Sequence, residues 1–390
     1  MSAYTQIYKK YMKRCLTLAK KAAGKTSPNP MVGAVILDKN LNFVSEGYHQ
    51  KCGEAHAEVN AINAAKEKNI DIKGGIIIVN LEPCSHYGKT PPCADLIIKS
   101  GLKKVVVGCT DPNEKVAGNG IKKCQNAGLE VITGILEEEC KKLNEIFFKN
   151  QLEKLPFITI KTATTIDGKI ATKTGSSKWI TGEKSRNFVQ KLRNNYDAIL
   201  TSSQTVIADD PSLTCRMKNG KNPIRIIVDS KLTTPASAKV YNNDGTRVII
   251  ATTLKDNKKY PTNVEILTVK KSNDKVDLKD LTQKLYDLGI NSVLVEAGGK
   301  LNGALLKEKL ADKLIHFTAP KLLADTTAKS FAEGFDIENI KFIIVRPLAL
   351  QSDNASLETI KILASIFTAP YYCCVRYWSG LLFCAILMIS

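Results

Sequence analysis

The sequence predicts two different α/β domains, and three observations support that prediction. Segments typical of β-strands alternate with segments typical of helices, which is the pattern of layered α/β folds. The alternation is interrupted at Gln151–Pro156 and begins again at Phe157, but no internal repeat relates the two halves. A chain of 390 residues also has the length of two or three average domains. We therefore expect domains over residues 1–150 and 151–365, followed by an apolar tail, residues 366–390, whose role stays open.

The first domain is expected to have three layers, with helices on both faces of one sheet. Apolar residues at helical spacing predict a first helix over Ile7–Ala23, and the Ser-Pro-Asn-Pro run at Ser27–Pro30 ends it. Val32–Leu37 and Val44–Tyr48 have the pattern of paired strands joined by a turn. The remaining elements are expected as helices at Ala57–Lys68, Ala94–Ser100, Gly120–Ala127 and Leu136–Lys149, and as strands at Gly75–Leu81, Lys104–Gly108 and Glu130–Thr133.

The second domain is expected to be another α/β fold, and the tail that follows it is unusual. Arg376 is the single charged residue between Ile362 and Ser390. A membrane-spanning helix needs about 20 apolar residues, and Pro370 and Arg376 leave a run of about half that length. We expect no membrane role, and the tail is interpreted as a buried terminal strand pair or as an aberrant end. The predicted strands of the second domain are Phe157–Thr162, Ala198–Thr201, Ile224–Val228, Val248–Ala251 and Ser292–Glu296, with helices such as Ser185–Asn194 and Leu278–Leu288 between them.

Composition limits the classes of protein and partner. With 44% hydrophobic and 24% charged residues, the chain is neither collagen-like nor largely disordered. Its net charge is +18, but lysine supplies 48 of the 56 basic residues and is spread along the chain. Nucleic-acid-binding surfaces usually cluster basic residues with aromatic ones, so we expect phosphorylated small-molecule substrates and no nucleic acid. Eleven irregularly spaced cysteines without a secretory signal favour reduced thiols and a cytoplasmic location.

Three residues have the pattern of a metal site with an open position. His56 and Glu58 lie at the start of a predicted helix, Cys84 follows a predicted strand, and Cys93 lies at the start of the next helix. One imidazole and two thiolates suit one catalytic Zn²⁺ per chain, with a fourth position left for water. Helix N-termini favour the thiolate forms. This is the general pattern of zinc nucleobase deaminases, in which the metal activates a water and a glutamate, here Glu58, transfers the protons.

A structural zinc site is the alternative interpretation. Such a site normally has four protein ligands, so it would need one more ligand than His56, Cys84 and Cys93. His49 and His86 are the nearby residues that could supply the fourth ligand. The complete pattern, in which a strand ends in Glu-Pro-Cys and a helix begins at Thr-Pro-Pro-Cys, favours catalytic zinc.

Five motifs then occur in an order that resembles one enzyme family. They are Pro-Asn-Pro-Met-Val-Gly at Pro28–Gly33, Gly47–His49, His56–Glu58, the run Leu81–Cys93 and Asp-Pro-Asn at Asp111–Asn113. Together they are similar to the bifunctional deaminase–reductases of riboflavin biosynthesis, the RibD type, from about Tyr8 to about Leu323. The resemblance implies a cytidine-deaminase-like first domain, a dihydrofolate-reductase-like second domain, and NADPH beside Zn²⁺. We also expect a homo-oligomer.

For the first domain, the resemblance implies a set of residues that recognise a pyrimidine carrying a ribose phosphate. Beside proline, Asn29 and Asp111 could equally serve ordinary turns, and His86 is interpreted as a loop or outer residue. The implied substrate-binding residues are Asn29, His49, Lys89, Asp111 and Asn113.

In the second domain, the residues alone give a weaker signal. No Gly-x-Gly-x-x-Gly follows its first strand, so a standard dinucleotide-binding fold is not indicated. A strand ending in Glu-Ala-Gly-Gly at Glu296–Gly299 precedes a helix expected from about Leu301. Backbone N–H groups at such a helix start suit a pyrophosphate, although an ordinary glycine-rich turn has the same sequence.

The resemblance implies specific positions for the second domain. Arg193 and Arg216 could bind the ribose phosphate as forks, although helix arginines usually face solvent; Trp179 could be a core aromatic instead. No proton donor is assigned, and Asp209 and Glu296 are the residues to test. The implied NADPH-binding residues are Thr164, Trp179, Thr205, Asp209, Ser230, Gly298, Gly299, Lys300, Leu301, Asn302, Gly303 and Ala304. The implied substrate-binding residues are Ser177, Arg193, Leu213, Arg216 and Glu296.

The sequence therefore predicts a two-step enzyme. The zinc domain would remove the 2-amino group of 2,5-diamino-6-(5-phosphoribosylamino)pyrimidin-4-one, and the second domain would reduce the ribose of the product with NADPH. Two alternatives stay open: a zinc deaminase acting on a base in tRNA, and a deaminase whose reductase half is inactive because the tail replaces family strands.

Overall fold

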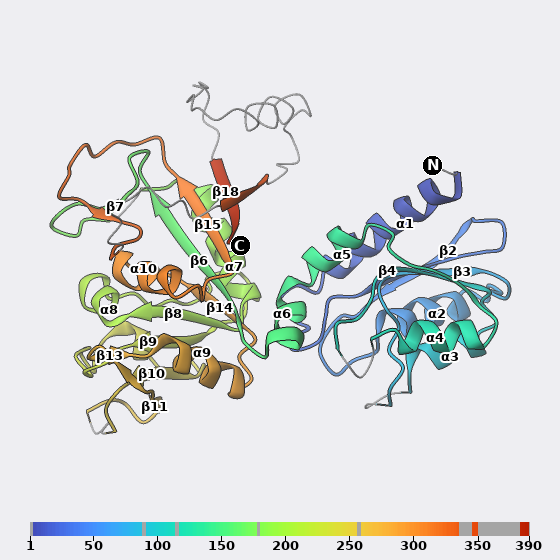
Figure 1. Ribbon diagram of the computed structural model, residues 1–390, viewed down its shortest axis with the longest axis horizontal. Helices are drawn as coiled ribbons and strands as arrows, with labels where there is room; N and C mark the ends of the chain where they lie inside the picture. Colours follow the sequence, from blue (N-terminus) through green and yellow to red (C-terminus); the bar gives the residue numbers. More distant parts are fainter. Residues whose placement is uncertain are drawn as a thin grey trace. The chain divides into compact units, whose positions relative to one another are not determined.

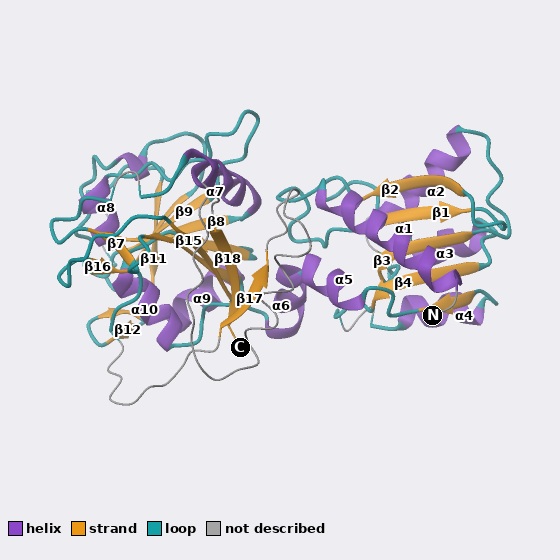
Figure 2. Cartoon of the chain, turned by 90° about the horizontal axis from the view of Figure 1, so that it is seen from above, coloured by secondary structure: helices purple, strands orange, loops and turns teal. Residues whose placement is uncertain are grey.

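The computed structural model describes residues 3–87, 91–113, 117–177, 180–255, 259–334, 345–349 and 383–389. Its contacts divide the chain into two compact units, which Figures 1 and 2 show. Unit 1 contains Met1–Phe157 together with Leu285–Asn291, and unit 2 contains Ile158–Lys284 and Ser292–Ser390.

Unit 1 is built on a five-stranded sheet with the order β2-β1-β3-β4-β5. Strand β1 is antiparallel to both of its neighbours, β2 and β3, whereas β3, β4 and β5 run parallel. The strands are β1 (Gly33–Leu37), β2 (Phe43–Tyr48), β3 (Ile76–Leu81), β4 (Lys104–Cys109) and β5 (Glu130–Ile132).

Alternating apolar side chains of this sheet form two separate cores, one on each face. On β3, Ile77 and Val79 pack with helices α2 (Ala57–Glu67), α3 (Cys93–Lys99) and α4 (Asn119–Asn126). Ile76 and Ile78 of the same strand pack with helix α1 (Ala3–Lys20) and with α5 (Glu137–Leu143). Figure 1 shows the two groups of helices on opposite sides of the sheet. The period of two in a strand produces this division, and the predicted three-layer architecture is confirmed.

One predicted helix is interrupted in the structure. The expected helix over Leu136–Lys149 consists of α5 and α6 (Glu145–Glu153), which are separated at Asn144. Asn144 leaves helical geometry, with φ −107° and ψ 23°, and its side chain binds the backbone of Met31. A tertiary contact made by Asn144 therefore overrides the local helix pattern.

Unit 2 contains a nine-stranded sheet with the order β11-β10-β9-β8-β14-β6-β15-β18-β17. Neighbours from β11 to β14 are parallel, as are β6 and β15, whereas β18 is antiparallel to both β15 and β17. All five strands predicted for this half are present in the sheet. They are β6 (Phe157–Thr164), β8 (Ala198–Ser202), β9 (Ile224–Val228), β10 (Val248–Thr252) and β14 (Ser292–Val295); the sheet also contains β11 (Val264–Thr268), β15 (Lys313–Thr318), β17 (Val345–Ala349) and β18 (Phe383–Ile389).

The helices of unit 2 connect these strands, and short strands form two small ribbons beside the main sheet. Val189 and Leu192 of α7 pack on Leu294, Ile315 and Phe317 of the sheet. The helices are α7 (Glu183–Asn195), α8 (Ser203–Asp209), α9 (Leu278–Asp287), α10 (Gly299–Lys307) and the 3₁₀ turn η1 (Lys239–Tyr241); the ribbons pair β7 (Lys169–Ala171) with β16 (Lys329–Ser330) and β12 (Lys271–Ser272) with β13 (Lys275–Val276).

Part of the apolar tail forms a strand of the main sheet. Phe383–Ile389 lies between β15 and β17, and the rest of residues 366–390 lies outside the described residues. No helix in the described part of the chain combines the length and the apolar character that a membrane span requires.

Candidate functional site

The predicted metal ligands lie together at one edge of the sheet of unit 1. His56 is the residue before α2, Cys84 follows β3, and Cys93 is the first residue of α3. The Nδ1 atom of His56 lies 3.6 Å from the Sγ atom of Cys84 and 3.3 Å from that of Cys93. All three donor atoms lie within 4.8 Å of one another. Two helix starts and one strand end therefore supply the cluster, as the sequence predicted.

The donor set fits Zn²⁺ in both chemistry and size. Tetrahedral zinc with Zn–S bonds of about 2.3 Å and Zn–N bonds of about 2.05 Å places sulfur and nitrogen ligands about 3.6 Å apart. The backbone N–H of Cys93 donates to Cys84 Sγ at 3.3 Å. Hydrogen bonds to this sulfur outweigh the opposing effect of burial and lower the pKa of Cys84 to about 4, so the site favours the thiolate that binds a metal.

The carboxyl group of Glu58 lies beside this cluster, in the first turn of α2. Glu58 is 3% exposed, and burial together with the charge of Cys84 raises the pKa of its carboxyl to about 7. A carboxyl in this position can hold a proton or accept one at neutral pH. This is the property that a proton-transferring residue of a hydrolytic site requires.

The alternative of a four-ligand structural site is not supported by the described residues. Of the two candidate fourth ligands, His49 has both ring nitrogens occupied: Nδ1 lies 3.1 Å from the carbonyl oxygen of Ala55 and Nε2 lies 3.3 Å from Nδ2 of Asn29. His86 does not belong to the donor cluster. In the described part of the chain the cluster has three protein ligands, which is the number of an open, catalytic zinc site.

Asn29 contacts His49 from a loop before β1 that two buried amides hold in place. The N–H of Met31 donates to Oδ1 of Asn144 at 2.8 Å, and the carbonyl of Met31 accepts from Nδ2 of Asn144 at 3.0 Å and of Asn80 at 3.1 Å. Asn80 also accepts the N–H of Gly33 at 2.7 Å. Because Met31 follows Asn29 by two residues, these contacts fix the position from which Asn29 reaches His49.

Asp111 and Asn113 form a tight turn after β4. Oδ1 of Asp111 accepts the N–H of Asn113 at 2.8 Å, which is the turn geometry that an Asp-Pro-Asn sequence favours. Asp111 is 8% exposed, and burial raises the pKa of its carboxyl to about 6. The turn chemistry expected of Asp111 is therefore present, and substrate binding by this turn stays a prediction.

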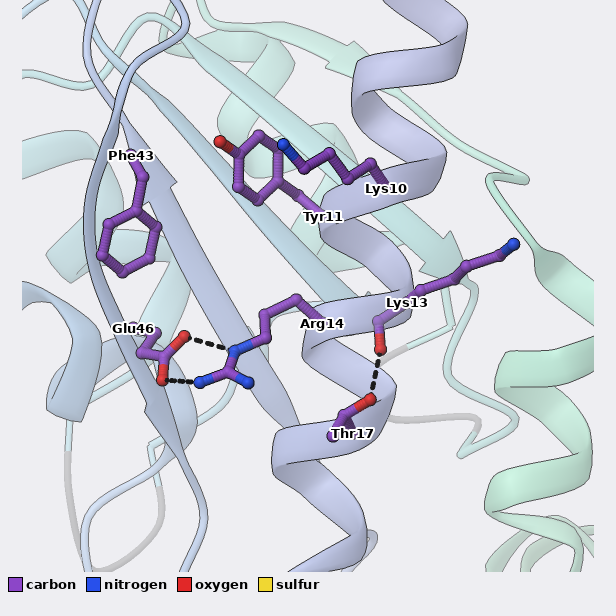
Figure 3. A pocket seen from close by; sticks show the side chains of 7 residues that line it. All are labelled: Lys10, Tyr11, Lys13, Arg14, Thr17, Phe43 and Glu46. Atoms are coloured by element: carbon purple, nitrogen blue, oxygen red, sulfur yellow. Dashed lines mark hydrogen bonds and ion pairs between the residues drawn. The ribbon is translucent and has the colours of Figure 1, made fainter. Parts of the chain in front are cut away.

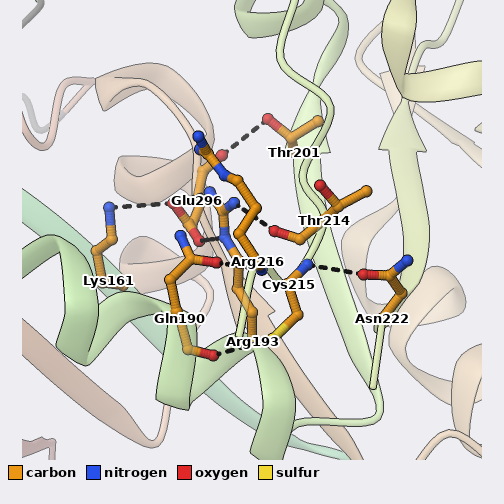
Figure 4. A network of polar contacts seen from close by, with 9 residues as sticks. All are labelled: Lys161, Gln190, Arg193, Thr201, Thr214, Cys215, Arg216, Asn222 and Glu296. Atoms are coloured by element: carbon orange, nitrogen blue, oxygen red, sulfur yellow. Dashed lines mark hydrogen bonds and ion pairs between the residues drawn. The ribbon is translucent and has the colours of Figure 1, made fainter. Parts of the chain in front are cut away.

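In unit 2, the predicted residues Arg193 and Glu296 form a buried network of charges together with Lys161, which was not predicted. Glu296, which follows β14, accepts two hydrogen bonds from Arg193 of α7, at 2.7 and 3.1 Å. Nζ of Lys161 on β6 lies 3.1 Å from the same carboxylate. The third donor group of Arg193 binds the carbonyl of Thr214 at 2.9 Å. Figure 4 shows that each nitrogen of the Arg193 guanidinium makes a contact within the protein, and its role as a phosphate fork stays a prediction.

This network makes Glu296 a poor proton donor. Burial opposes ionisation of Glu296, but the adjacent Lys161 and Arg193 cations outweigh it and lower the pKa of the carboxyl to about 2. At neutral pH Glu296 carries no proton to donate. Of the two residues proposed for testing, Asp209 is exposed at the end of α8.

The glycine-rich turn after Glu296 leads directly into α10, which begins at Gly299 rather than at Leu301. A Cβ atom on Gly299 would collide with the carbonyl oxygen of Ser330, and one on Gly303 would collide with that of Glu333. These two glycines allow α10 to lie against residues 330–333. The segment Gly298–Ala304 thus has the strand-to-helix geometry that suits a phosphate.

The other predicted residues of unit 2 lie at the ends of its strands, in connecting loops or, for Thr205, in the first turn of α8. Thr164 ends β6 and its Oγ1 atom lies 3.0 Å from Nε2 of His316, whereas Thr205 contacts Ser202 at the start of α8. Oγ of Ser230, after β9, accepts the N–H of Val276 at 3.0 Å. Leu213 is buried with φ 55°, Arg216 is exposed, and Ser177 is half-buried.

Comparison with known proteins identifies the family. Residues 156–356 match the RibD C-terminal domain, and residues 5–109 match the cytidine and deoxycytidylate deaminase zinc-binding region. The riboflavin biosynthesis protein RibD of Actinobacillus pleuropneumoniae is 46% identical over 335 residues, which is 85% of this chain and 88% of that protein. The chain belongs to the RibD family. RibD of Aquifex aeolicus is also 46% identical, over 82% of this chain and 89% of its own length.

Solved RibD structures are similar to this chain over almost its full length. The diaminohydroxyphosphoribosylaminopyrimidine deaminase/5-amino-6-(5-phosphoribosylamino)uracil reductase of Thermotoga maritima gives a TM-score of 0.84 at 37% identity and covers 99% of this chain and 100% of its own. RibD of Acinetobacter baumannii gives 0.82 at 34% identity, with 99% of both chains covered. The predicted fold class is confirmed. The RibD C-terminal match also extends to residue 356, beyond Leu323, where the sequence resemblance was expected to weaken.

Lys89 and Trp179 lie outside the described residues, so their roles stay predictions. Sequence reasoning missed Lys161, Asn80 and Asn144. A lysine in a predicted buried strand was a usable signal for Lys161, whereas nothing local distinguishes Asn144 from other helix-surface asparagines.

A surface hollow of about 590 Å³ lies between α1 and β2 of unit 1. It contains none of the predicted site residues, and Figure 3 shows Arg14 within it, paired with Glu46. We assign it no part in the RibD reactions.

Replacing Asn144 with alanine tests the amide contacts to Met31. Loss of the two hydrogen bonds at this buried position is expected to lower the free energy of unfolding of unit 1 by about 1–3 kcal/mol. We also expect a higher KM for deamination, because Asn29 loses its support. Urea unfolding and steady-state kinetics measure both effects, with the exposed Asn126→Ala as the control. Equal stability and equal KM in both variants would contradict this account.

Proposed function

We propose that this chain performs both reactions of its family and that the residues described above perform them. Its zinc unit deaminates 2,5-diamino-6-(5-phosphoribosylamino)pyrimidin-4-one, and its reductase unit converts the ribose of the resulting 5-amino-6-(5-phosphoribosylamino)uracil to a ribityl chain. The observation that carries this proposal is the triangle of His56, Cys84 and Cys93 beside the buried carboxyl of Glu58. Family matches to both halves favour this function over a tRNA deaminase.

In the deaminase unit, each residue has a distinct task. Zn²⁺ bound by the three ligands would supply a water of lowered pKa as the nucleophile. Glu58 accepts a proton from the attacking water and delivers it to the ring nitrogen. It then transfers the second proton of that water, from the newly added hydroxyl group, to the leaving amine, which departs as ammonia while the carbonyl forms. Asn29 and His49 bind the pyrimidine. Burial lowers the pKa of the His49 ring and favours its neutral form, and the contact of Nδ1 with the Ala55 carbonyl places the ring proton on Nδ1. Nε2 then accepts from Asn29.

In the reductase unit, the chain supplies binding and orientation. NADPH would supply the hydride that reduces C1 of the opened ribose. We infer that the segment Gly298–Ala304 binds its phosphates, and that Thr164, Thr205, Asp209 and Ser230 contact the rest of the cofactor. Glu296 holds Arg193 and Lys161 in place near the predicted substrate residues. We also propose a cytoplasmic enzyme, because its two ligand thiols must stay reduced, and a homo-oligomer, which light scattering would test.

Substitution of a metal ligand tests this assignment directly. In Cys84→Ser, we expect the zinc content to fall well below one ion per chain and ammonia release to be lost, because the soft thiolate ligand is removed. NADPH oxidation with the deaminated substrate should persist, since no residue of unit 2 is changed.

The half-exposed Cys215, in unit 2, provides the matched control. Cys215→Ser should retain one zinc per chain and ammonia release. Ammonia release by a zinc-free Cys84→Ser protein would contradict the metal assignment. Ammonia release by wild type without NADPH oxidation would indicate an inactive reductase half.

A further inference from the structure

One buried carboxylate of unit 1 has no part in the proposed chemistry. Glu82 is 3% exposed and follows directly after β3. Its Oε2 atom accepts the backbone N–H groups of Asp111 at 3.2 Å and Gly118 at 2.9 Å. Its Oε1 atom accepts those of Gly120 at 2.9 Å and Ile121 at 3.2 Å. Four backbone donors from two segments therefore converge on one side chain.

These four donors lie on both sides of the turn that is proposed to bind substrate. Asp111 begins the Asp-Pro-Asn turn, and the carbonyl of Asn113 accepts the N–H of Ala117 at 2.8 Å. Gly118 and Gly120 lie at the start of α4. Gly118 is the N-cap residue of this helix and has no side chain that could cap it. Glu82 thus binds the entry and the exit of one loop.

Glu82 also lies two residues before a metal ligand in the sequence. Glu82 is followed by Pro83 and Cys84, and a Cβ atom on Gly120 would collide with the carbonyl oxygen of Pro83. The start of α4 therefore lies in direct contact with the segment that carries the zinc ligand. A displacement of either segment would change the distance between the metal and the Asp111–Asn113 turn.

We propose that Glu82 is a positioning residue of the deaminase, which fixes the Asp111–Asn113 turn relative to Cys84 and thereby sets the affinity for substrate. The inference rests on the proposed substrate-binding role of that turn. Both oxygens are needed, because each accepts two N–H groups. A glutamine at this position would direct its NH₂ group at one of the two pairs, so two hydrogen bonds would be lost in either orientation.

The test is the kinetics of Glu82→Gln. Loss of two of the four hydrogen bonds that connect Glu82 to the turn and to the start of α4 is expected to raise the KM for deamination by about tenfold or more, while kcat changes by less than about threefold. Zinc should stay at one ion per chain, and reduction of the deaminated substrate by the same chain should be unchanged. Glu67→Gln, on the exposed end of α2, is the matched control. A variant that loses zinc and kcat together at unchanged KM would overturn the inference, because this is the result of a purely structural role.

Asp111→Ala separates failure of the inference from failure of the proposed function. If Glu82 acts through the turn, the double variant Glu82→Gln/Asp111→Ala should show a KM close to that of Asp111→Ala alone. An unchanged KM in Asp111→Ala would contradict the substrate role of the turn. A raised KM in Asp111→Ala with a wild-type KM in Glu82→Gln would overturn the positioning role alone.

A second variant keeps the test available if Glu82→Gln does not fold. Gly118→Ala leaves the carboxylate intact but strains the backbone whose N–H donates to Glu82, because Gly118 has φ 77°. Among the described residues, no atom lies within 4 Å of the added Cβ, so the substitution introduces no clash there. We expect the same increase in KM at smaller amplitude. Wild-type KM in a folded Gly118→Ala protein would count against the inference.

Discussion

Replacing Glu58 with glutamine is expected to lower kcat for deamination by about a thousandfold or more. Glutamine has the same size and can still contact the substrate, but it cannot accept a proton from water or return one to the leaving amine. Zinc content should not change, because His56, Cys84 and Cys93 are untouched. The rate of ammonia release by a fixed amount of zinc-loaded protein at saturating substrate gives kcat for each variant.

The bifunctional chain supplies its own controls for this variant. Glu58→Gln should reduce the deaminated substrate with NADPH at the wild-type rate, which shows that the protein is folded. Glu67→Gln changes a carboxylate at the exposed end of the same helix and should deaminate normally. A deamination rate in Glu58→Gln within tenfold of wild type would exclude Glu58 as the proton-transferring group.

The second large effect is expected on stability, from Glu296→Gln. Arg193 and Lys161 would remain largely buried, since their side chains are 11% and 16% exposed, without the carboxylate that neutralises them. Breaking such a buried ion network by removing one partner costs about 3–5 kcal/mol. We expect loss of NADPH oxidation and faster hydrogen exchange in the peptide Ser292–Val295. Glu265→Gln, which breaks the exposed pair with Arg247, is the control and should cost less than about 1 kcal/mol.

The same carboxylate should make unit 2 sensitive to acid. The pKa of Glu296 is about 2 in the folded protein, against an ordinary value of 4.5. Because the folded value is the lower one, this stabilisation is complete above pH 4.5 and is lost as the pH falls towards 2. The shift corresponds to roughly 3 kcal/mol. Urea unfolding of unit 2 across this range should show the loss in wild type, and its absence in Glu296→Gln. An identical pH dependence in the two proteins would contradict the ionised assignment.

The sequence predicted the fold well where local patterns and tertiary structure agree. Buried strands such as Ile76–Leu81 carry a continuous apolar run, and the helices around them carry the 3.6-residue period. The break at Asn144 was not predicted, because the cause is a backbone 113 residues away. The tail that contains Phe383–Ile389 was left undecided between a buried terminal strand pair and an aberrant end, because an apolar run alone does not identify its partners in a sheet.

The residues of the candidate sites also divide into those that a local sequence pattern identifies and those that only the tertiary structure shows. His56, Cys84 and Cys93 could be predicted because metal ligands must be of particular types at particular places on strand and helix ends. Glu82 and Asn80 could not, because their partners are backbone groups, which carry no sequence signal. For Arg193 and Glu296 the positions were named, but their mutual pairing appears only when α7 and β14 are placed together.

The alternation along β3 has a consequence for how this part of the chain can change over generations. Both faces of the strand are apolar, so after a one-residue deletion the helices would still pack against apolar side chains on each face. However, it would turn Asn80 away from Gly33 and Met31, and would shift Cys84 by about 3.3 Å. The segment can therefore tolerate exchanges of side chains but not a change in length, and we expect functional descendants of this sequence to keep the spacing between Ile76 and Cys84.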